Sequence, residues 1–304
     1  LGRTLRATMR RARRIATAAK WNPAAYLAFG EPRLQPAADL ISRVALDGKK
    51  PAIADVGCGT GAPTRLLRQT WPDAPILCVD SSADMLAACH DTLELDENVR
   101  FKEADFDGFA KDNESFDLVF SNAALHWADD APSLISRLLT SKVRPGGLLA
   151  VQIPDTRAQR SHQLFGEVAE SLGLAERLAD VRVPSNQHDA AVYFDRLLGP
   201  LCESLECWTT TYVQVLKGDD PVFRFVRETG MQPVLAALGD ADAVDAFEAE
   251  YKRRAAEEYP KRKDGTTLFP FTRFFLIARR PGLMDLYAEY SAYHDHQLEK
   301  GWKS

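Results

Sequence analysis

One stretch constrains the fold of this chain more than any other. It is Asp55-Val56-Gly57-Cys58-Gly59-Thr60-Gly61, at the end of the short apolar segment 52–56. A strand that runs into clustered glycines and then a helix is typical of nucleotide-binding α/β proteins, because glycine permits a tight turn and close backbone approach to a ligand. The last glycine comes one residue earlier than the dinucleotide-binding pattern requires. The loop has no lysine or arginine, so we expect a nucleoside ligand without a phosphate chain.

Strands and helices alternate on both sides of this loop. Short apolar runs predict strands, and amphipathic runs between them predict helices. The predicted strands are 52–56, 76–80, 99–105, 116–121 and 148–153, and the predicted helices are 36–46, 64–69, 83–90 and 132–142, with a turn at 144–147. This alternation favours an α/β protein with a parallel sheet that is covered by helices on both faces.

The pattern changes after Pro154. Segments 160–200 and 219–259 are predicted to be mainly helical, and 206–216 and 271–279, rich in β-branched and aromatic residues, are predicted strands. We therefore expect a doubly wound, mostly parallel, seven-stranded Rossmann-like sheet. The predicted organisation is a basic extension at 1–20, one domain at 21–282 with helical insertions around 156–200 and 219–262, and a tail at 283–304.

Composition excludes several classes of protein. The chain has 304 residues and a net charge of −5, and its first 20 residues hold seven basic and no acidic residues. The rest of the chain is therefore acidic and a poor match for nucleic acid. No apolar run is long enough to span a membrane. The five cysteines are scattered without a C-x-x-C pair, so we expect no disulfide scaffold, no metal site and a reducing compartment.

The basic segment 1–20 has three interpretations. It resembles a mitochondrial or plastid transit peptide in composition, since it is rich in Arg, Ala and Thr and free of acids. It also fits a flexible tail or cloning remnant, or an arm that contacts nucleic acid. Without a transit function, the expected location is the cytoplasm.

Three aspartates end successive predicted strands: Asp55, Asp80 and Asp105. The carboxyl ends of parallel strands meet at one sheet edge, where open α/β sheets bind ligands. Asp80 follows Gly59 by 21 residues, a position from which an acid accepts hydrogen bonds from ribose hydroxyls. Asp105 beside Phe106 suits an adenine ring, with the acid on the exocyclic amine. Each acid alone fits a helix cap or turn equally well.

At this point the sequence resembles class I S-adenosylmethionine-dependent methyltransferases. The resemblance implies S-adenosyl-L-methionine as cofactor and S-adenosyl-L-homocysteine as product. It places Asp55 near the methionine amino group, Asp80 on the ribose and Asp105 on the adenine. The cofactor-binding residues that it implies are Asp55, Gly57, Cys58, Gly59, Gly61, Asp80, Ser81, Met85, Asp105, Phe106 and Asn122.

Further motifs look like those of trans-aconitate methyltransferases, a family that makes a monomethyl ester of a tricarboxylate. The similar segments cover roughly residues 21–280. They include Trp21-Asn22-Pro23, Ser121-Asn122-Ala123-Ala124-Leu125-His126-Trp127, Pro145-Gly146-Gly147-Leu148-Leu149, Thr210-Thr211-Tyr212 and Glu257-Glu258-Tyr259-Pro260. The resemblance implies a small organic acid as substrate and leaves the oligomeric state open, with a monomer plausible.

Some positions depart from that family's pattern. This chain has Gln35, Thr209 and Gln232 where relatives often carry Arg, and His126 where they often carry Gln. Fewer guanidinium groups would weaken tricarboxylate binding, because guanidinium–carboxylate pairs are bidentate and directional. Two alternatives therefore stay open, namely a methyltransferase for another small-molecule or carrier-linked acceptor, and a non-catalytic cofactor-binding regulator.

Methylation of a carboxylate needs no general base, because the acceptor is already ionised at pH 7. We expect Asn122, His126 and Trp127 to orient the reactants, with His126 as base an alternative if the acceptor is a hydroxyl or an amine. The predicted acceptor-binding residues are Trp21, Tyr26, Arg33, His162, Tyr212 and Arg273. Hydrophobic packing for the aromatic residues and surface ion pairs for the two arginines are the competing explanations.

Overall fold

The computed structural model describes residues 30–46, 48, 50–93, 96–179, 181, 190–197 and 201–283. The basic segment 1–20 and the predicted acceptor residues Trp21 and Tyr26 lie outside this part. The chain forms two compact units. We call Pro36–Gln152, Asp189–Trp208 and Phe275–Ser304 the sheet unit, and Leu1–Gln35, Ile153–His188 and Thr209–Phe274 the helical unit. That the two units together make one domain stays a prediction.

A seven-stranded sheet has the strand order β3-β2-β1-β4-β5-β7-β6. Neighbours from β3 across to β5 pair in parallel. The strands are β1 (Ile53–Val56), β2 (Ile76–Asp80), β3 (Val99–Glu103), β4 (Phe116–Asn122), β5 (Val143–Pro154), β6 (Ser204–Leu216) and β7 (Thr267–Arg279). The predicted seven-stranded, mostly parallel sheet is confirmed. Chain order reverses between β1 and β4, which makes the ends of these two strands the topological switch point where such sheets bind ligands.

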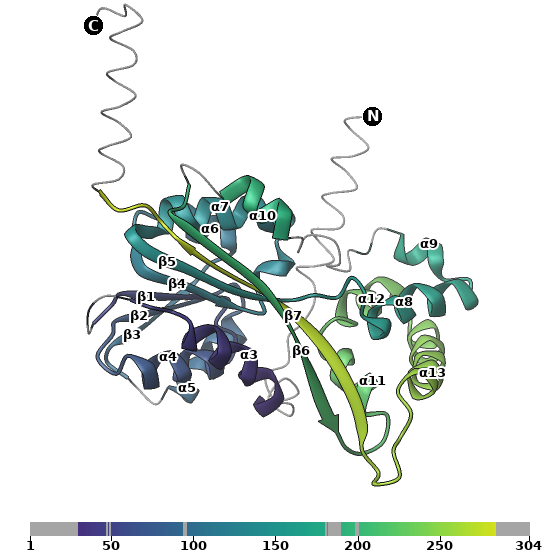
Figure 1. Ribbon diagram of the computed structural model, residues 1–304. Coiled ribbons are helices and arrows are strands. Elements are labelled where there is room, and N and C mark those ends of the chain that lie inside the picture. The colour runs from purple at the N-terminus through teal and green to yellow at the C-terminus, as the bar shows by residue number, and fades with distance from the viewer. Residues whose placement is uncertain are drawn as a thin grey trace, which may run out of the picture. The chain divides into compact units, whose positions relative to one another are not determined.

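The central strands are mostly apolar because both of their faces are covered. All four residues of β1 are buried, and Val119 and Leu149 in β4 and β5 have no exposed surface. Burial of one such side chain contributes about 1.5–3 kcal/mol. Figure 1 shows α4 (Ala62–Thr70) and α5 (Ala83–Thr92) on one face of the sheet. The other face carries α6 (Phe106–Lys111), α7 (Ala131–Lys142) and α10 (Ala190–Leu197).

Side-chain caps fix where several of these helices begin. Ser82 Oγ accepts a hydrogen bond from Met85 N at 3.3 Å at the start of α5. Asp130 Oδ1 accepts from Ser133 N at 3.1 Å at the start of α7. Such caps satisfy backbone donors that the first turn of a helix leaves unpaired. Helix α5 therefore begins directly after the end of β2, where candidate site residues lie.

Some element boundaries differ from the prediction. The predicted turn at 144–147 is part of β5, and a register shift between Phe116 and Leu118 of β4 accommodates it. The predicted helix 36–46 is α3 (Gly30–Ser42), which passes through Pro36 and ends earlier. The last strand starts at Thr267 rather than at 271. The sequence pattern also missed α6 and a short 3₁₀ helix, η1 (Leu125–Trp127), since both are too short to show periodicity.

The helical unit has its own core. It contains α8 (Arg160–Ser171), α9 (Ala175–Leu178), α11 (Pro221–Arg227), α12 (Gln232–Leu238) and α13 (Ala241–Glu258) together with the parts of β5, β6 and β7 beyond the unit boundary. Phe165 of α8 packs against Tyr251 of α13 with ring centroids 5.4 Å apart. Phe225 meets Phe269 edge to face at 5.2 Å. Aromatic pairs of this kind stabilise a small core beyond the area that they bury.

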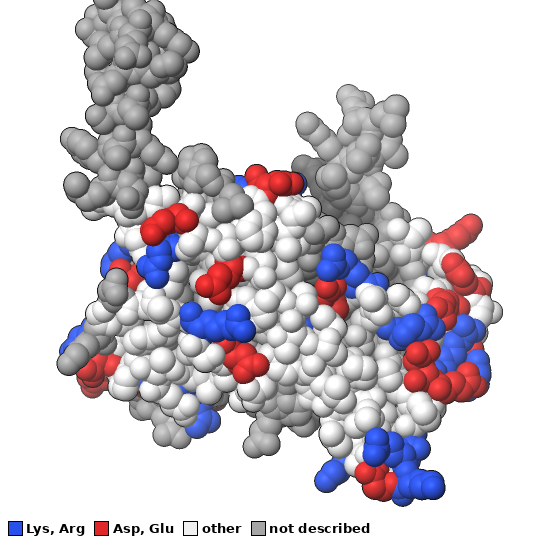
Figure 2. All heavy atoms as spheres, viewed as in Figure 1, with Lys and Arg blue, Asp and Glu red and all other residues white. Residues whose placement is uncertain are grey.

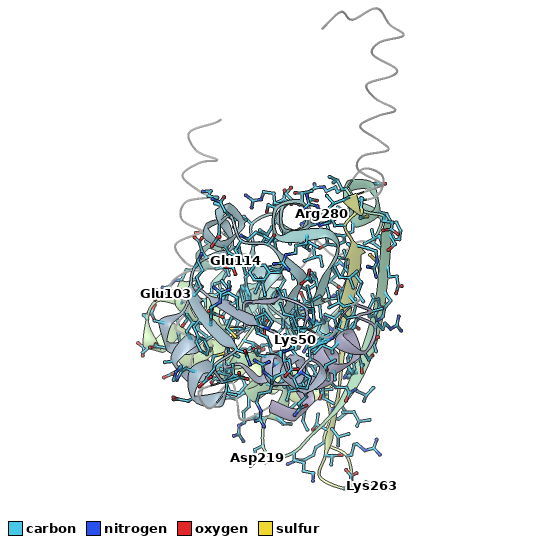
Figure 3. The ribbon with its side chains drawn as sticks, turned by 90° about the vertical axis from the view of Figure 1, so that its left-hand side faces the viewer. Lys50, Glu103, Glu114, Asp219, Lys263 and Arg280 are labelled. Atoms are coloured by element: carbon cyan, nitrogen blue, oxygen red, sulfur yellow. The ribbon has the colours of Figure 1, made fainter. Side chains whose placement is uncertain are left out.

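Several surface charges on α13 and its neighbour α8 are paired. Arg253 bridges Glu250 and Glu257, and Arg160 of α8 bridges Glu258. Figure 2 shows acidic and basic side chains side by side over this region. In Figure 3, Glu103 at the end of β3 is labelled at the left margin of the view, and Arg280 after β7 is labelled near the top. None of the described helices combines the length and the apolar character that a membrane span needs.

Candidate active site

The glycine loop between β1 and α4 turns sharply because its glycines adopt left-handed backbone angles. Gly57 has φ +75° and Gly59 has φ +55°. The N–H groups of Gly57 and Cys58 both donate to Val79 O, at 2.7 and 3.1 Å. A Cβ atom on Gly57 would lie 2.2 Å from the Cβ of Ala124, so only glycine fits there. The loop is thus held against β2 on one side and against the residues after β4 on the other.

Asp80 at the end of β2 fastens the loop to the start of α5. Its Oδ2 accepts from Gly59 N at 3.0 Å and its Oδ1 accepts from Ser82 N at 3.0 Å. Burial raises the pKa of Asp80, and these backbone hydrogen bonds oppose the rise. A carboxylate held this way keeps its orientation and can accept a further hydrogen bond from a ligand hydroxyl.

Asp55 at the end of β1 is buried with only one oxygen bonded. Thr64 Oγ1 donates to its Oδ2 at 2.7 Å, and its Oδ1 has no hydrogen-bond partner among the described residues. Burial is the main cause that raises the pKa of Asp55 well above its usual value. A cationic ligand group beside Oδ1 would reverse this effect, because an opposite charge favours the ionised carboxylate.

Other buried polar atoms at the same sheet edge also lack partners among the residues described. They are Asn122 Oδ1 at the end of β4, both side-chain atoms of Gln152 in β5, and Thr60 Oγ1 in the loop. Buried polar groups are nearly always hydrogen-bonded. Ala123, the residue after β4, has the left-handed φ of 54°, which is uncommon for a non-glycine residue. Unsatisfied atoms and backbone strain together mark the switch point as a place for a polar ligand.

The predicted adenine-side residues lie after β3 and at the start of α5. Asp105 is exposed, and its Oδ1 caps α6 by accepting from Gly108 N at 2.7 Å. Phe106 is half-buried, and its ring comes within 4.0 Å of the point where a Gly57 Cβ would lie. Ser81 is exposed, and Met85 is buried in α5. Asp105 thus has the capping function that the sequence left as its alternative, and its contact with adenine stays a prediction.

His126 and Trp127 lie in η1, directly after β4. His126 is 8% exposed, and its ring centroid lies 4.9 Å from that of Trp127, which is half-buried. Both belong to the sheet unit together with Asn122 and the glycine loop. Their position after β4 is the predicted one, and their orienting function stays a prediction.

The remaining predicted residues belong to the helical unit. His162 of α8 is half-buried, with ring centroids 5.2 Å from Phe165 and 5.9 Å from Phe271. Burial, aided by the charge of Arg273, lowers the pKa of His162 to about 3, so its ring is neutral at pH 7. A Cβ atom on Gly230 would lie 2.6 Å from His162 Nε2. The ring is therefore packed closely against Gly230.

Arg273 of β7 is 6% exposed, and its guanidinium carbon lies 4.4 Å from the centroid of the Phe271 ring. Arg273 is therefore buried rather than at the surface, and its acceptor-binding function stays a prediction. Tyr212 on β6 is half-buried. Arg33 belongs to α3, and its side chain is outside the described part. The structure thus brings His162 and Arg273 together within one unit.

The sequence prediction missed Thr64 and Gln152. Thr64 supports Asp55 from the first turn of α4, and Gln152 is a buried amide of β5 that lies opposite Asn122 of β4. Gln152 did carry a signal, because it is the one polar residue in the apolar run 148–153. A polar side chain in a strand that is buried on both faces costs free energy unless something bonds to it.

The comparisons with known proteins agree with this geometry. A model described as "Methyltransferase domain" matches residues 53–147. A trans-aconitate 2-methyltransferase of Azoarcus sp. (strain BH72) is 39% identical over 86% of this chain and 99% of its own. One from Streptomyces avermitilis is 40% identical over 86% of this chain and 97% of its own. The solved phosphoethanolamine N-methyltransferase 2 of Haemonchus contortus, in complex with S-adenosyl-L-methionine, shares the fold with a TM-score of 0.53 and 18% identity, covering 85% of this chain and 56% of that one.

Fold, glycine loop and strand-end acids define a class I methyltransferase that uses S-adenosylmethionine. The buried atoms at the switch point fit this cofactor, since Asp55 Oδ1 suits an ammonium group and the amides of Asn122 and Gln152 suit polar groups of the ligand. The chain belongs to the trans-aconitate 2-methyltransferase family. The resemblance predicted from the sequence motifs is confirmed.

Proposed function

We propose that this enzyme transfers a methyl group to one carboxylate of a small polycarboxylic acid, with trans-aconitate as the first candidate, and releases a monomethyl ester. Family membership over 86% of the chain is the observation that carries the proposal, since the matched relatives are named for this acceptor. When bound, S-adenosylmethionine supplies an electrophilic methyl group on a sulfonium. The residues of the chain bind, orient and enclose the two reactants.

On the cofactor side, we assign three tasks to the strand-end acids. Asp55 pairs with the methionine ammonium group, which its unbonded Oδ1 supports. Asp80 accepts from the ribose hydroxyls while it holds Gly59 and Ser82. Asp105 accepts from the adenine amine beside Phe106. The loop backbone keeps these positions fixed, so that little ordering is required when the cofactor binds.

On the acceptor side, we assign Arg273 and His162 to carboxylates that do not react. A buried guanidinium is a strong partner for a carboxylate, since it donates two parallel hydrogen bonds. His162 is neutral at pH 7 because its pKa is lowered to about 3, so it contributes a hydrogen bond and no charge. Arg273 beside it supplies the positive charge, and Phe271 packs against the guanidinium plane.

The proposed reaction needs orientation rather than proton transfer. A carboxylate is ionised at pH 7 and attacks directly, in line with the departing sulfur. His126 is then an orienting residue, and its ring contact with Trp127 restricts its motion. Exclusion of water strengthens the charge interactions that hold the reactants.

A second class of acceptor, another small or carrier-linked acid, remains a candidate because this chain lacks arginines that its relatives often carry. Gln232 replaces one of them, and its Nε2 donates to Arg227 O at 2.8 Å, which ties this side chain to α11. Thr209, a second replacement, is exposed on β6. Fewer charges suit a dicarboxylate or a carrier-linked acid better than a tricarboxylate.

Incubation with methyl-labelled cofactor and a panel of organic acids tests the proposal. We expect a base-labile methyl ester, most rapidly from trans-aconitate, identified by mass spectrometry. A base-stable product would indicate O-alkyl or N-methylation, and the proposal would be wrong. Cofactor binding without any product across the panel would favour the regulatory alternative.

We further propose a cytoplasmic enzyme with a small-molecule partner. All five cysteines are thiols, which supports a reducing compartment. The organelle alternative rests on residues 1–20, which are outside the described residues.

A further inference from the structure

Three cysteines that lie far apart in the sequence come together directly beneath the cofactor loop. The Sγ atoms of Cys58, Cys78 and Cys89 all lie within 4.8 Å of one another. Cys58 belongs to the glycine loop, Cys78 to β2 and Cys89 to α5. The expectation of no metal site rested on the wide spacing of the cysteines along the chain, but the fold brings these three close together in space. All three belong to the sheet unit.

From this arrangement we propose that Cys58, Cys78 and Cys89 form a binding site for a thiophilic d¹⁰ metal ion, of which Zn²⁺ and Cd²⁺ are representatives. Zinc–sulfur bonds are about 2.3 Å long, so three sulfurs around one ion lie roughly 3.8–4.0 Å apart. The observed separations need only small side-chain rotations to reach this geometry. Soft thiolates select such ions over Mg²⁺ or Ca²⁺, which prefer oxygen.

The surroundings of the three thiols are closed and include one oxygen. Cys58 is 2% exposed, and Cys78 and Cys89 have no exposed surface. A Cβ on Gly61 would lie 2.7 Å from Cys89 Sγ, so the loop backbone packs on this sulfur. Thr64 Oγ1 lies 3.8 Å from Cys78 Sγ. This hydroxyl is the nearest candidate for a fourth ligand, and its other contact is Asp55.

Binding would replace three S–H bonds by three metal–sulfur bonds and release the three protons to solvent. A divalent ion with three thiolates carries one net negative charge, which is far less costly to bury than three separate thiolates. Because protons are released, the apparent affinity should rise with pH. The ion would link the loop, β2 and α5, the three segments that Asp80 also connects.

Cadmium binding to the full chain tests the proposal, since thiolate-to-cadmium charge transfer absorbs in the ultraviolet. We expect metal-free reduced protein to bind one equivalent of Cd²⁺. The charge-transfer absorbance should then have the intensity expected for three thiolate ligands, and added Zn²⁺ should displace the Cd²⁺. Cys78→Ala and Cys89→Ala should lower the affinity roughly 100-fold or more. Cys202→Ala and Cys207→Ala are matched controls, because they remove thiols elsewhere in the same unit and should leave Cd²⁺ binding unchanged.

A second measurement needs no variant and so does not depend on whether the variants fold. Wild-type protein is alkylated in mild denaturant with and without Zn²⁺, and the labelled peptides are identified. Selective protection of Cys58, Cys78 and Cys89 over Cys202 and Cys207 supports the site. Equal labelling of all five thiols, or no charge-transfer band in the wild type, overturns it and leaves the cluster as ordinary packing of small apolar side chains.

Discussion

Burial has opposite effects on one ionisable group of the sheet unit and one of the helical unit. Asp55 of the sheet unit is an acid, and burial raises its pKa. His162 of the helical unit is a base, and burial lowers its pKa to about 3. Both groups are driven toward their neutral forms, but only Asp55 has a buried oxygen without a described partner. A cationic ligand would therefore favour the ionised carboxylate of Asp55, whereas the imidazole of His162 stays neutral.

The two units also differ in how the sequence encodes their residues. Asp55, the glycine loop and Asp80 lie at or directly after strand ends, and hydrogen bonds from loop N–H groups to Val79 and Asp80 hold the loop against β2. His162 and Arg273 come from α8 and β7, more than 100 positions apart, and their proximity depends on the packing of the whole unit. Changes in the sheet unit should therefore act through backbone geometry, and those in the helical unit through charge and packing.

The largest effect is expected from a substitution at Gly57, because it would alter the backbone of the glycine loop. Gly57→Ala should lower the free energy of unfolding by about 4 kcal/mol, because the new Cβ would overlap with Ala124 and the left-handed φ would be strained. Cofactor binding should be lost as well. Urea denaturation and titration calorimetry with S-adenosylhomocysteine measure the two effects.

Gly146→Ala is the matched control, since Gly146 has φ +79° but no heavy atom within 4 Å of its would-be Cβ. It should cost only about 1 kcal/mol, the strain of the backbone alone. Equal losses for the two variants would mean that the contact with Ala124 does not position the loop.

Asp80→Ala should remove the anchor of the loop and the expected acceptor for the ribose. We expect cofactor affinity to fall by about 1–3 kcal/mol, roughly 5- to 150-fold. Asp84→Ala, at an exposed acid in the first turn of α5, should leave the affinity unchanged. If Asp80→Ala bound the cofactor as tightly as the wild type, the ligand would lie elsewhere on the sheet edge.

The lowered pKa of His162 should make the stability of the helical unit sensitive to acid. Its pKa is about 3 in the folded state and near 6.5 when unfolded, so between these values the unfolded state binds more protons. Stability is therefore complete above pH 6.5 and falls as the pH decreases, by about 2 kcal/mol between pH 6.5 and 5. His162→Gln should abolish this part of the slope in urea denaturation, whereas His90→Gln, at an exposed histidine, should retain it. An identical slope in His162→Gln and the wild type would contradict the neutral buried ring.

How much the sequence predicted depends on whether a local motif or the packing of distant segments defines a feature. The glycine loop and the strand-end acids could be found because a local backbone motif fixes them. Thr64 and the thiol cluster could not, since their importance comes from what the fold places beside them, and Gln152 carried only the signal of one polar residue in an apolar run. The short helix α6 escaped detection for a related reason, because Asp105 starts it as a cap and six residues show no periodicity. The sequence pattern predicts a helix start at Pro36, but α3 begins earlier and continues through this proline.

The smallest effect, and the one that best separates the two units, is expected from Arg273→Lys. Lysine keeps the positive charge but loses the planar fork that binds a carboxylate through two hydrogen bonds. The acceptor KM should rise about tenfold, equivalent to about 1.4 kcal/mol, with the cofactor dissociation constant unchanged. Arg279→Lys is the control, since Arg279 donates to Gly146 O at 2.8 Å and to Ala45 O at 3.1 Å within the sheet unit. It should lower stability without changing the acceptor KM. Equal changes in the acceptor and cofactor constants of Arg273→Lys would instead assign Arg273 a purely structural task, and the acceptor site would have to be sought elsewhere.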